Sequence, residues 1–149
     1  MGQQQLLLLV LATVIVGLAT VAGIQAFDEG RTQATQDALQ QRALAIGSDV
    51  YAATEKPDQL GGVSLDSGKS SIAAAAGFGS SATGIPAEGA GSSADCDITS
   101  TDPVKIICAD DGSDSSNSDS DASTNQSVVV EVDSEGPSVT SINNNTVGS

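Results

Sequence analysis

The sequence predicts an α+β protein in which a long amino-terminal helix precedes a small antiparallel β-rich head with one disulfide. Three observations lead to this prediction. The first 27 residues contain no ionisable side chain, and residues 6–27 are almost all apolar. Residues 32–56 then repeat apolar side chains at helical spacing. Alternating Val and Ile residues, which are typical of half-buried strands, follow only beyond residue 100.

Residues 6–27, the apolar segment, are long enough to cross a bilayer, because a spanning helix needs about 20 apolar residues. The segment has no basic residue ahead of it and exceeds the apolar core of a signal peptide, so we expect a retained helix. Small residues four apart, Thr13 with Gly17 and Ala19 with Gly23, predict close helix packing. Alternatively, Gly and Ala are simply frequent in membrane helices. The residues expected to pack between helices are Leu6, Leu7, Leu8, Leu9, Val10, Leu11, Val14, Ile15, Gly17, Leu18, Ala19, Val21, Gly23, Ile24 and Phe27.

Residues 30–56 are predicted to continue the helix in amphipathic form. Four apolar residues lie at positions i, i+4, i+7 and i+11 and share one helical face. We call them the head-packing stripe, because we expect them to pack under the strands: Leu39, Ala43, Ile46 and Val50. Pro57 should end the helix after Lys56. Gly30 and Gly47 are expected to bend or loosen it locally.

The remaining residues, 57–149, should form the small Ser/Gly/Asp-rich head with a flexible carboxyl-terminal tail. Residues 58–95 are punctuated by Gly and Ser, which predicts loop with short extended pieces near residues 71–78. Strands are predicted at residues 104–108 and 128–133, where apolar and polar side chains alternate.

A turn at Gly136-Pro137 should lead into a returning strand over residues 138–142, giving three or four antiparallel strands in all. Residues 143–149 are expected to be a loose end.

Two cysteines, Cys96 and Cys108, are expected to form a disulfide in an oxidising compartment. With no His and no second Cys pair, the sequence disfavours zinc. Closing so short a loop stabilises a fold by about 3 kcal/mol in the chain-entropy model. Two buried free thiols are the alternative.

The net charge of −14 disfavours nucleic-acid binding, because few basic groups are present to neutralise phosphates. Such acidity keeps a protein soluble, and a high-salt habitat is one specific cause.

The motif search predicts no enzyme, metal site or cofactor. Gly68-Lys69-Ser70 lacks the glycine spacing of a phosphate-binding loop. Residues 117–121 begin like a calcium loop, but Ala122 and Val128 occupy the positions of the turn glycine and the closing Glu. Asn125 and Asn144 begin glycosylation sequons. Sequons also arise by chance in a chain this rich in Asn and Ser. The nearby Ser and Thr residues could carry O-linked sugar instead.

Several segments of residues 1–62 resemble type IV pilins and related pilin-like filament subunits. They are MGQQQLLLL at residues 1–9, ALQQRAL at 38–44, Tyr51, and PDQLGG at 57–62. The resemblance implies Gly2 as a processing site for a prepilin peptidase, with Gln3 starting the mature chain; otherwise Met1 is already the mature terminus. Pilins usually carry a Glu soon after the mature start, which pairs with a neighbour's terminal amine. The nearest candidate here is Gln5, so that charge pairing is absent or replaced by amide hydrogen bonds.

The resemblance implies a homopolymeric extracellular filament on the cell surface, built by a pilus assembly machinery. Residues 1–29 would lie in the inner or cytoplasmic membrane before assembly and in the filament core afterwards. The alternatives are a single-pass membrane-anchored surface protein acting as an adhesin or binding module, and a minor pseudopilin of a secretion system.

Overall fold

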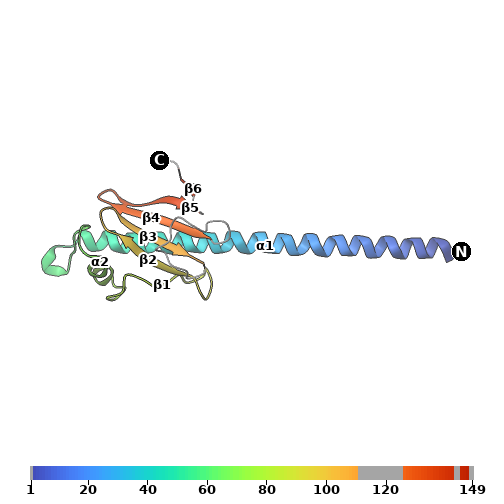
Figure 1. Cartoon of the computed structure of the whole chain (residues 1–149), viewed down its shortest axis with the longest axis horizontal. Helices are drawn as coiled ribbons and strands as arrows, with labels where there is room; N and C mark the ends of the chain where they lie inside the picture. The colour runs from blue at the N-terminus through green and yellow to red at the C-terminus, as the bar shows by residue number, and fades with distance from the viewer. Residues whose placement is uncertain (1, 111–125, 143–144, 148–149) are drawn as a thin grey trace. The chain divides into compact units, whose positions relative to one another are not determined.

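The computed structural model describes residues 2–110, 126–142 and 145–147 (Figure 1). The chain divides into a first unit, Met1–Gln33, and a second unit, Ala34–Ser149. The predicted α+β fold is confirmed: a long amino-terminal helix, an antiparallel sheet and one disulfide are all present.

Helix α1 runs from Gly2 to Thr54, as the absence of proline before Pro57 predicts. It ends two residues before the predicted Lys56, where the Thr54 hydroxyl donates to the Tyr51 carbonyl at 2.7 Å. Neither Gly30 nor Gly47 interrupts it. The helix is continuous through both positions, and the expectation that these glycines bend or loosen it locally stays a prediction.

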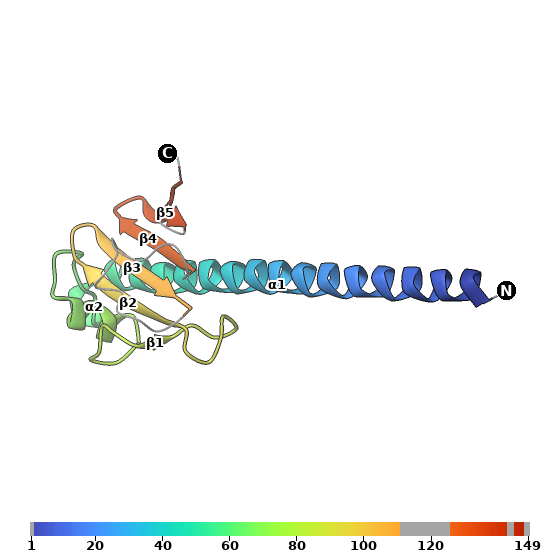
Figure 2. The same ribbon diagram turned by 45° about the vertical axis from the view of Figure 1, so that its right-hand side comes forward.

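The second unit holds a six-stranded antiparallel sheet in which each strand pairs with the next one along the chain (Figures 1 and 2). Its strands are β1 (Ile85–Pro86), β2 (Asp95–Ser100), β3 (Val104–Ala109), β4 (Ser127–Asp133), β5 (Gly136–Ile142) and β6 (Asn145–Thr146). The three predicted strands correspond to β3, β4 and β5. The predicted number of three or four strands is too low, because β2 and the two-residue strands β1 and β6 add to the sheet.

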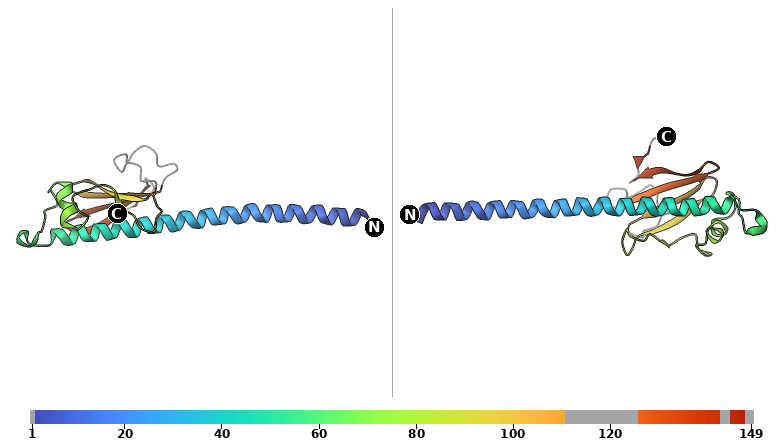
Figure 3. Two further views of the ribbon diagram at one scale, coloured as in Figure 1. Left: turned by 90° about the horizontal axis from the view of Figure 1, so that it is seen from below. Right: turned by 180° about the vertical axis from the view of Figure 1, so that it is seen from behind.

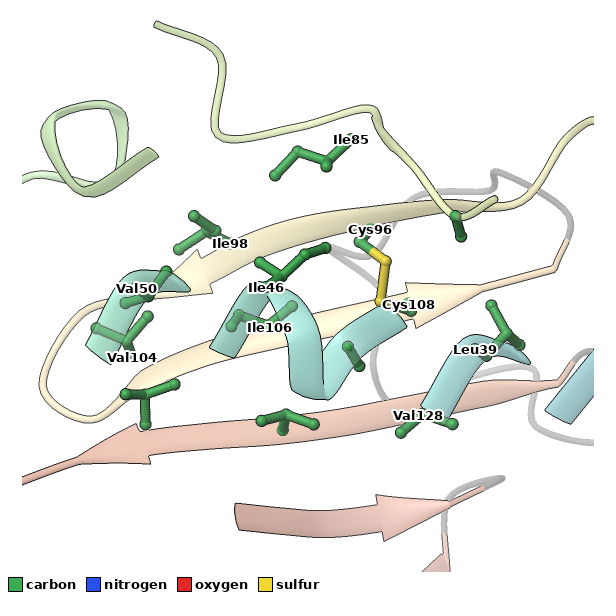
Figure 4. Close-up of a cluster of buried hydrophobic side chains, with 14 of the residues drawn as sticks. Leu39, Ile46, Val50, Ile85, Cys96, Ile98, Val104, Ile106, Cys108 and Val128 are labelled. Atoms are coloured by element: carbon green, nitrogen blue, oxygen red, sulfur yellow. A yellow bond between two sulfur atoms is a disulfide. The ribbon is translucent and has the colours of Figure 1, made fainter. Parts of the chain in front are cut away.

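The core of the second unit lies between one face of this sheet and the 34–54 part of α1 (Figures 3 and 4). The head-packing stripe, Leu39, Ala43, Ile46 and Val50, is completely buried, as predicted. The sheet residues in the same cluster alternate along the strands and are Cys96, Ile98, Val104, Ile106, Cys108, Val128, Val130 and Val132. Their register sets Val104 opposite Val132 and Ile106 opposite Val130, so one apolar face meets the helix.

A second helix, α2 (Lys69–Ala75), replaces the extended piece predicted near residues 71–78. Its Ile72 and Ala73 are buried in the core, and the Phe78 amide donates to the Ala73 carbonyl at 2.9 Å. The run of alanines from Ala73 to Ala76 has the highest helix propensity of any residue type, and Gly68 and Gly77 bound it. A short 3₁₀ helix, η1 (Asp58–Leu60), also lies in the predicted loop.

The turn between β4 and β5 is at Ser134 and Glu135, so Gly136-Pro137 is the start of β5 and the predicted turn position is wrong. The Asp133 carboxylate forms this turn by accepting hydrogen bonds from the Glu135 and Gly136 amides at 2.7 and 3.2 Å. The tail predicted as a loose end contains β6, which pairs with β5 at Ser141 and Ile142.

Candidate functional site

Within the first unit, the apolar segment of residues 6–27 exposes apolar side chains on all sides of its helix. Its large apolar side chains are between 52% and 83% exposed, with Phe27 the most exposed. They are Leu6, Leu7, Leu8, Leu9, Val10, Leu11, Val14, Ile15, Val16, Leu18, Val21, Ile24 and Phe27. Val16 belongs to this set on the same grounds as its neighbours, although the sequence-based list omits it. A helix with no polar face must be covered by lipid or by other protein.

Burying a Leu, Val or Ile side chain completely gains about 1.5–3 kcal/mol. The described side chains already contact their own helix, so we take the lower end of that range for thirteen of them. This gives on the order of 20 kcal/mol of burial free energy per chain. No other feature of the described chain offers a driving force for association of this size.

The threonines of the apolar segment do not interrupt this surface. The Thr13 hydroxyl donates to the Val10 carbonyl and the Thr20 hydroxyl to the Gly17 carbonyl, each at 2.8 Å. Their donors are therefore satisfied within the helix and cost little in dry surroundings. By length and composition, α1 is the one helix in the described chain that is apolar enough to cross a membrane.

Gly17 and Gly23 lie on this surface. A Cβ atom added at either position meets nothing within 4 Å in its own chain. Each glycine costs about 1 kcal/mol of helix stability relative to alanine. The fold of the described chain therefore does not require their small size, and each position leaves room for the close approach of another helix.

The second unit is strongly acidic, and three of its four basic residues make contacts within the unit. Seventeen of the 19 acidic residues follow Gln33 in the sequence, against four basic ones. Arg42 donates to the Pro86 carbonyl at 3.0 Å, and Lys69 donates to the Thr99 carbonyl at 3.1 Å. Lys105 forms an ion pair with Glu131 at 2.8 Å. These three cations tie elements of the second unit together instead of presenting a basic surface.

The predicted disulfide is present between Cys96 and Cys108, which face each other on β2 and β3 (Figure 4). Both cysteines are fully buried against the stripe of α1, so the bond is a structural link within the core.

The other residues singled out by sequence are not brought together into a site. Gly2 is the first residue of α1, and Lys69 lies in α2 with its ammonium on the Thr99 carbonyl, not in a phosphate-binding loop. The sequons at Asn125 and Asn144, and the acidic loop at residues 117–121, lie outside the described residues. Within residues 2–110, 126–142 and 145–147, no group of His, Cys, Asp or Glu side chains is arranged to hold a metal ion.

Gly47 lies in a helix–sheet contact that the sequence did not predict. A Cβ atom at this position would lie 2.9 Å from Pro137 Cβ and 3.2 Å from Val130 Cγ1. Gly47 therefore lies where α1 packs closely against β4 and β5. Gly47 follows the stripe residue Ile46 in the sequence. This neighbouring position is the sequence feature that could have predicted the contact.

Comparisons with protein-family models, with curated proteins and with solved structures gave no significant match to this chain.

Proposed function

We propose that this protein is the structural subunit of an extracellular, pilin-like filament that polymerises through its apolar segment. The observation that carries the proposal is the apolar surface of residues 6–27, exposed on all sides of the helix and joined to an acidic unit with its own packed core. The resemblance of residues 1–62 to type IV pilins supports the same function.

Two environments can cover such a helix, and they correspond to two states of a filament subunit. In a bilayer, one copy of the apolar segment is stable by itself, because its length matches the hydrocarbon thickness. Outside the bilayer, the same surface is covered only by other copies of the segment. Head-to-tail contacts whose rotation does not close a ring propagate into open fibres.

The second unit would form the outer layer of the filament. Its core is closed by the head-packing stripe and the disulfide, so it needs no partner to be folded. Its net negative charge keeps the outer surface hydrated and opposes sideways association of filaments.

A single-pass membrane-anchored surface protein is the second candidate, favoured by the hydropathy of α1 alone. In that case the apolar segment stays in lipid and the second unit acts as an adhesin or binding module. A minor pseudopilin of a secretion system would share the filament chemistry but occur in few copies.

The test is detergent removal from the purified full-length protein, followed by sedimentation and negative-stain electron microscopy. The proposal predicts thin fibres of uniform width in the pellet. Leu11→Lys should abolish the fibres, because a charge in a dry helix interface costs several kcal/mol. Ser92→Lys, which adds the same charge at an exposed loop position, should leave them intact.

Two results would favour the membrane-anchored candidate instead. One is amorphous aggregate without fibres from the wild-type protein. The other is quantitative recovery of the protein in added lipid vesicles, with no fibres at any ratio of lipid to protein.

A further inference from the structure

Gln25 is the polar residue of the apolar segment whose side chain has no partner. The hydroxyls of Thr13 and Thr20 donate to carbonyls of their own helix. The Gln25 side chain is exposed, and no hydrogen bond joins it to any residue that the structure describes. Its amide offers two N–H donors and one carbonyl acceptor.

An amide buried without partners is costly. A polar group that is moved into dry surroundings without a partner loses its hydrogen bonds to water and gains none in return. The helical neighbours of Gln25 within reach are Val21, Ala22, Asp28 and Glu29. Ionised carboxylates only accept hydrogen bonds, so Asp28 and Glu29 leave the Gln25 carbonyl without a donor.

The best partner on another copy is a second amide, because an amide both donates and accepts. Threonine hydroxyls that already donate within their own helix offer only an acceptor. In the first unit, amide side chains occur at Gln3, Gln4 and Gln5, at Gln25 itself, and at Gln33.

The axial offset between neighbouring copies distinguishes these partners. Pairing with Gln25 needs no offset, and pairing with Gln33 needs about 12 Å at 1.5 Å per residue. Pairing with residues 3–5 needs about 30–33 Å. A compact unit of about 115 residues has a radius of gyration near 13 Å, whereas packed helices lie only about 8–10 Å apart.

Second units of adjacent copies therefore compete for the same space unless they are displaced by roughly their own width, which the larger offset supplies.

We propose that Gln25 of one copy hydrogen-bonds to an amide side chain of residues 3–5 in a neighbouring copy, and that this pairing fixes the axial register of the filament. This inference rests on the proposed filament function. The ends of each apolar segment then meet the ends of its neighbours, and the two paired amides satisfy each other there.

Disulfide cross-linking of assembled filaments tests the register. The chain's own cysteines are both engaged in the Cys96–Cys108 bond, so introduced cysteines react only with one another. Gln25→Cys is combined in turn with a cysteine at Gln3, Gln4 or Gln5, and the filaments are oxidised. At least one pair should give a ladder of covalent oligomers, since a disulfide requires Cα atoms about 4.4–6.8 Å apart.

Two controls make the cross-linking specific. Gln25→Cys alone should remain monomeric on a denaturing gel. Gln25→Cys combined with Val14→Cys, which matches an offset of about 17 Å, should remain monomeric as well. A covalent dimer from Gln25→Cys alone would show copies in level register and would overturn the inference.

A second measurement avoids introduced cysteines. Gln25→Leu should still assemble, because it enlarges the apolar surface, but its filaments should lose the sharp axial repeat in their diffraction pattern. Gln33→Leu is the matched control and should keep the repeat. Unchanged order in Gln25→Leu would refute the register role while leaving the filament itself intact, whereas absence of wild-type filaments would refute both.

Discussion

Replacing Gly47 with Ala should destabilise the second unit, although the same change usually stabilises a helix. The added Cβ would lie 2.9 Å from Pro137 Cβ, 3.2 Å from Val130 Cγ1 and 3.5 Å from Val132 Cγ2. Overpacking a tight core costs about 1–3 kcal/mol. Relief of the glycine entropy cost returns only about 0.5–1 kcal/mol. The expected net loss is about 1 kcal/mol, or a melting temperature lower by about 4 °C.

The chain provides its own spectroscopic probe for this measurement. Tyr51 is the single tyrosine, there is no tryptophan, and the Tyr51 side chain packs half-buried against the core. Urea unfolding of the full chain in detergent, followed by tyrosine fluorescence, therefore reports on the second unit. Ser48→Ala, at the next and exposed helix position, is the matched control and should be neutral or slightly stabilising.

A double-mutant cycle locates the clash. Pro137→Gly removes the nearest atom, so its combination with Gly47→Ala should lose less stability than the two single changes added together. A Gly47→Ala protein as stable as the wild type, or more stable, would contradict the close helix–sheet contact.

Three further predictions concern assembly and the disulfide. Gly17→Leu or Gly23→Leu should block filament formation while leaving the monomer in the membrane, and normal fibres in electron micrographs of both variants would refute close packing at these sites. Raising NaCl from about 0.1 to 1 M should accelerate assembly in light-scattering assays, because the screening length falls from about 10 to 3 Å; an unchanged rate would show that charge repulsion does not limit assembly. Replacing Cys96 and Cys108 together with Ala should lower the unfolding free energy of the second unit by about 3 kcal/mol in urea titrations. An unchanged urea midpoint would show that the bond contributes no stability.

Sequence periodicity was sufficient to predict the contacts that organise the second unit. Leu39, Ala43, Ile46 and Val50 form a stripe because the helical repeat places them on one face, and all four are buried. Strands β3 and β4 are recognisable for a related reason: their Val and Ile residues alternate, and the register brings the alternating sets together.

Short elements were predicted poorly because their sequences carry weak local signals. Helix α2 is seven residues long, and its two serines beside a glycine resemble a loop. Strand β2 contains Asp95 and Asp97, which disfavour strands, and it is held by its pairing with β3 and by the disulfide. Tertiary contacts stabilise both elements, and a local pattern does not contain that information.

The sequence predicts the apolar composition of the apolar segment, but not the surroundings of its individual glycine and glutamine residues. Hydropathy alone indicates that residues 6–27 must be buried in lipid or against other protein. Side-chain contacts are needed to show that Gly17 and Gly23 have open space around them and that Gln25 has no hydrogen-bond partner among the described residues. The contact at Gly47 was not predicted, because a glycine's role depends on what lies opposite it.

Cryo-electron microscopy of surface appendages sheared from producing cells tests the central claim most directly. The account predicts a fibre whose axis is filled by bundled helices, with residues 6–27 of each copy surrounded by the same residues of its neighbours. Sheared material without fibres, together with this protein remaining in the membrane fraction, would contradict it.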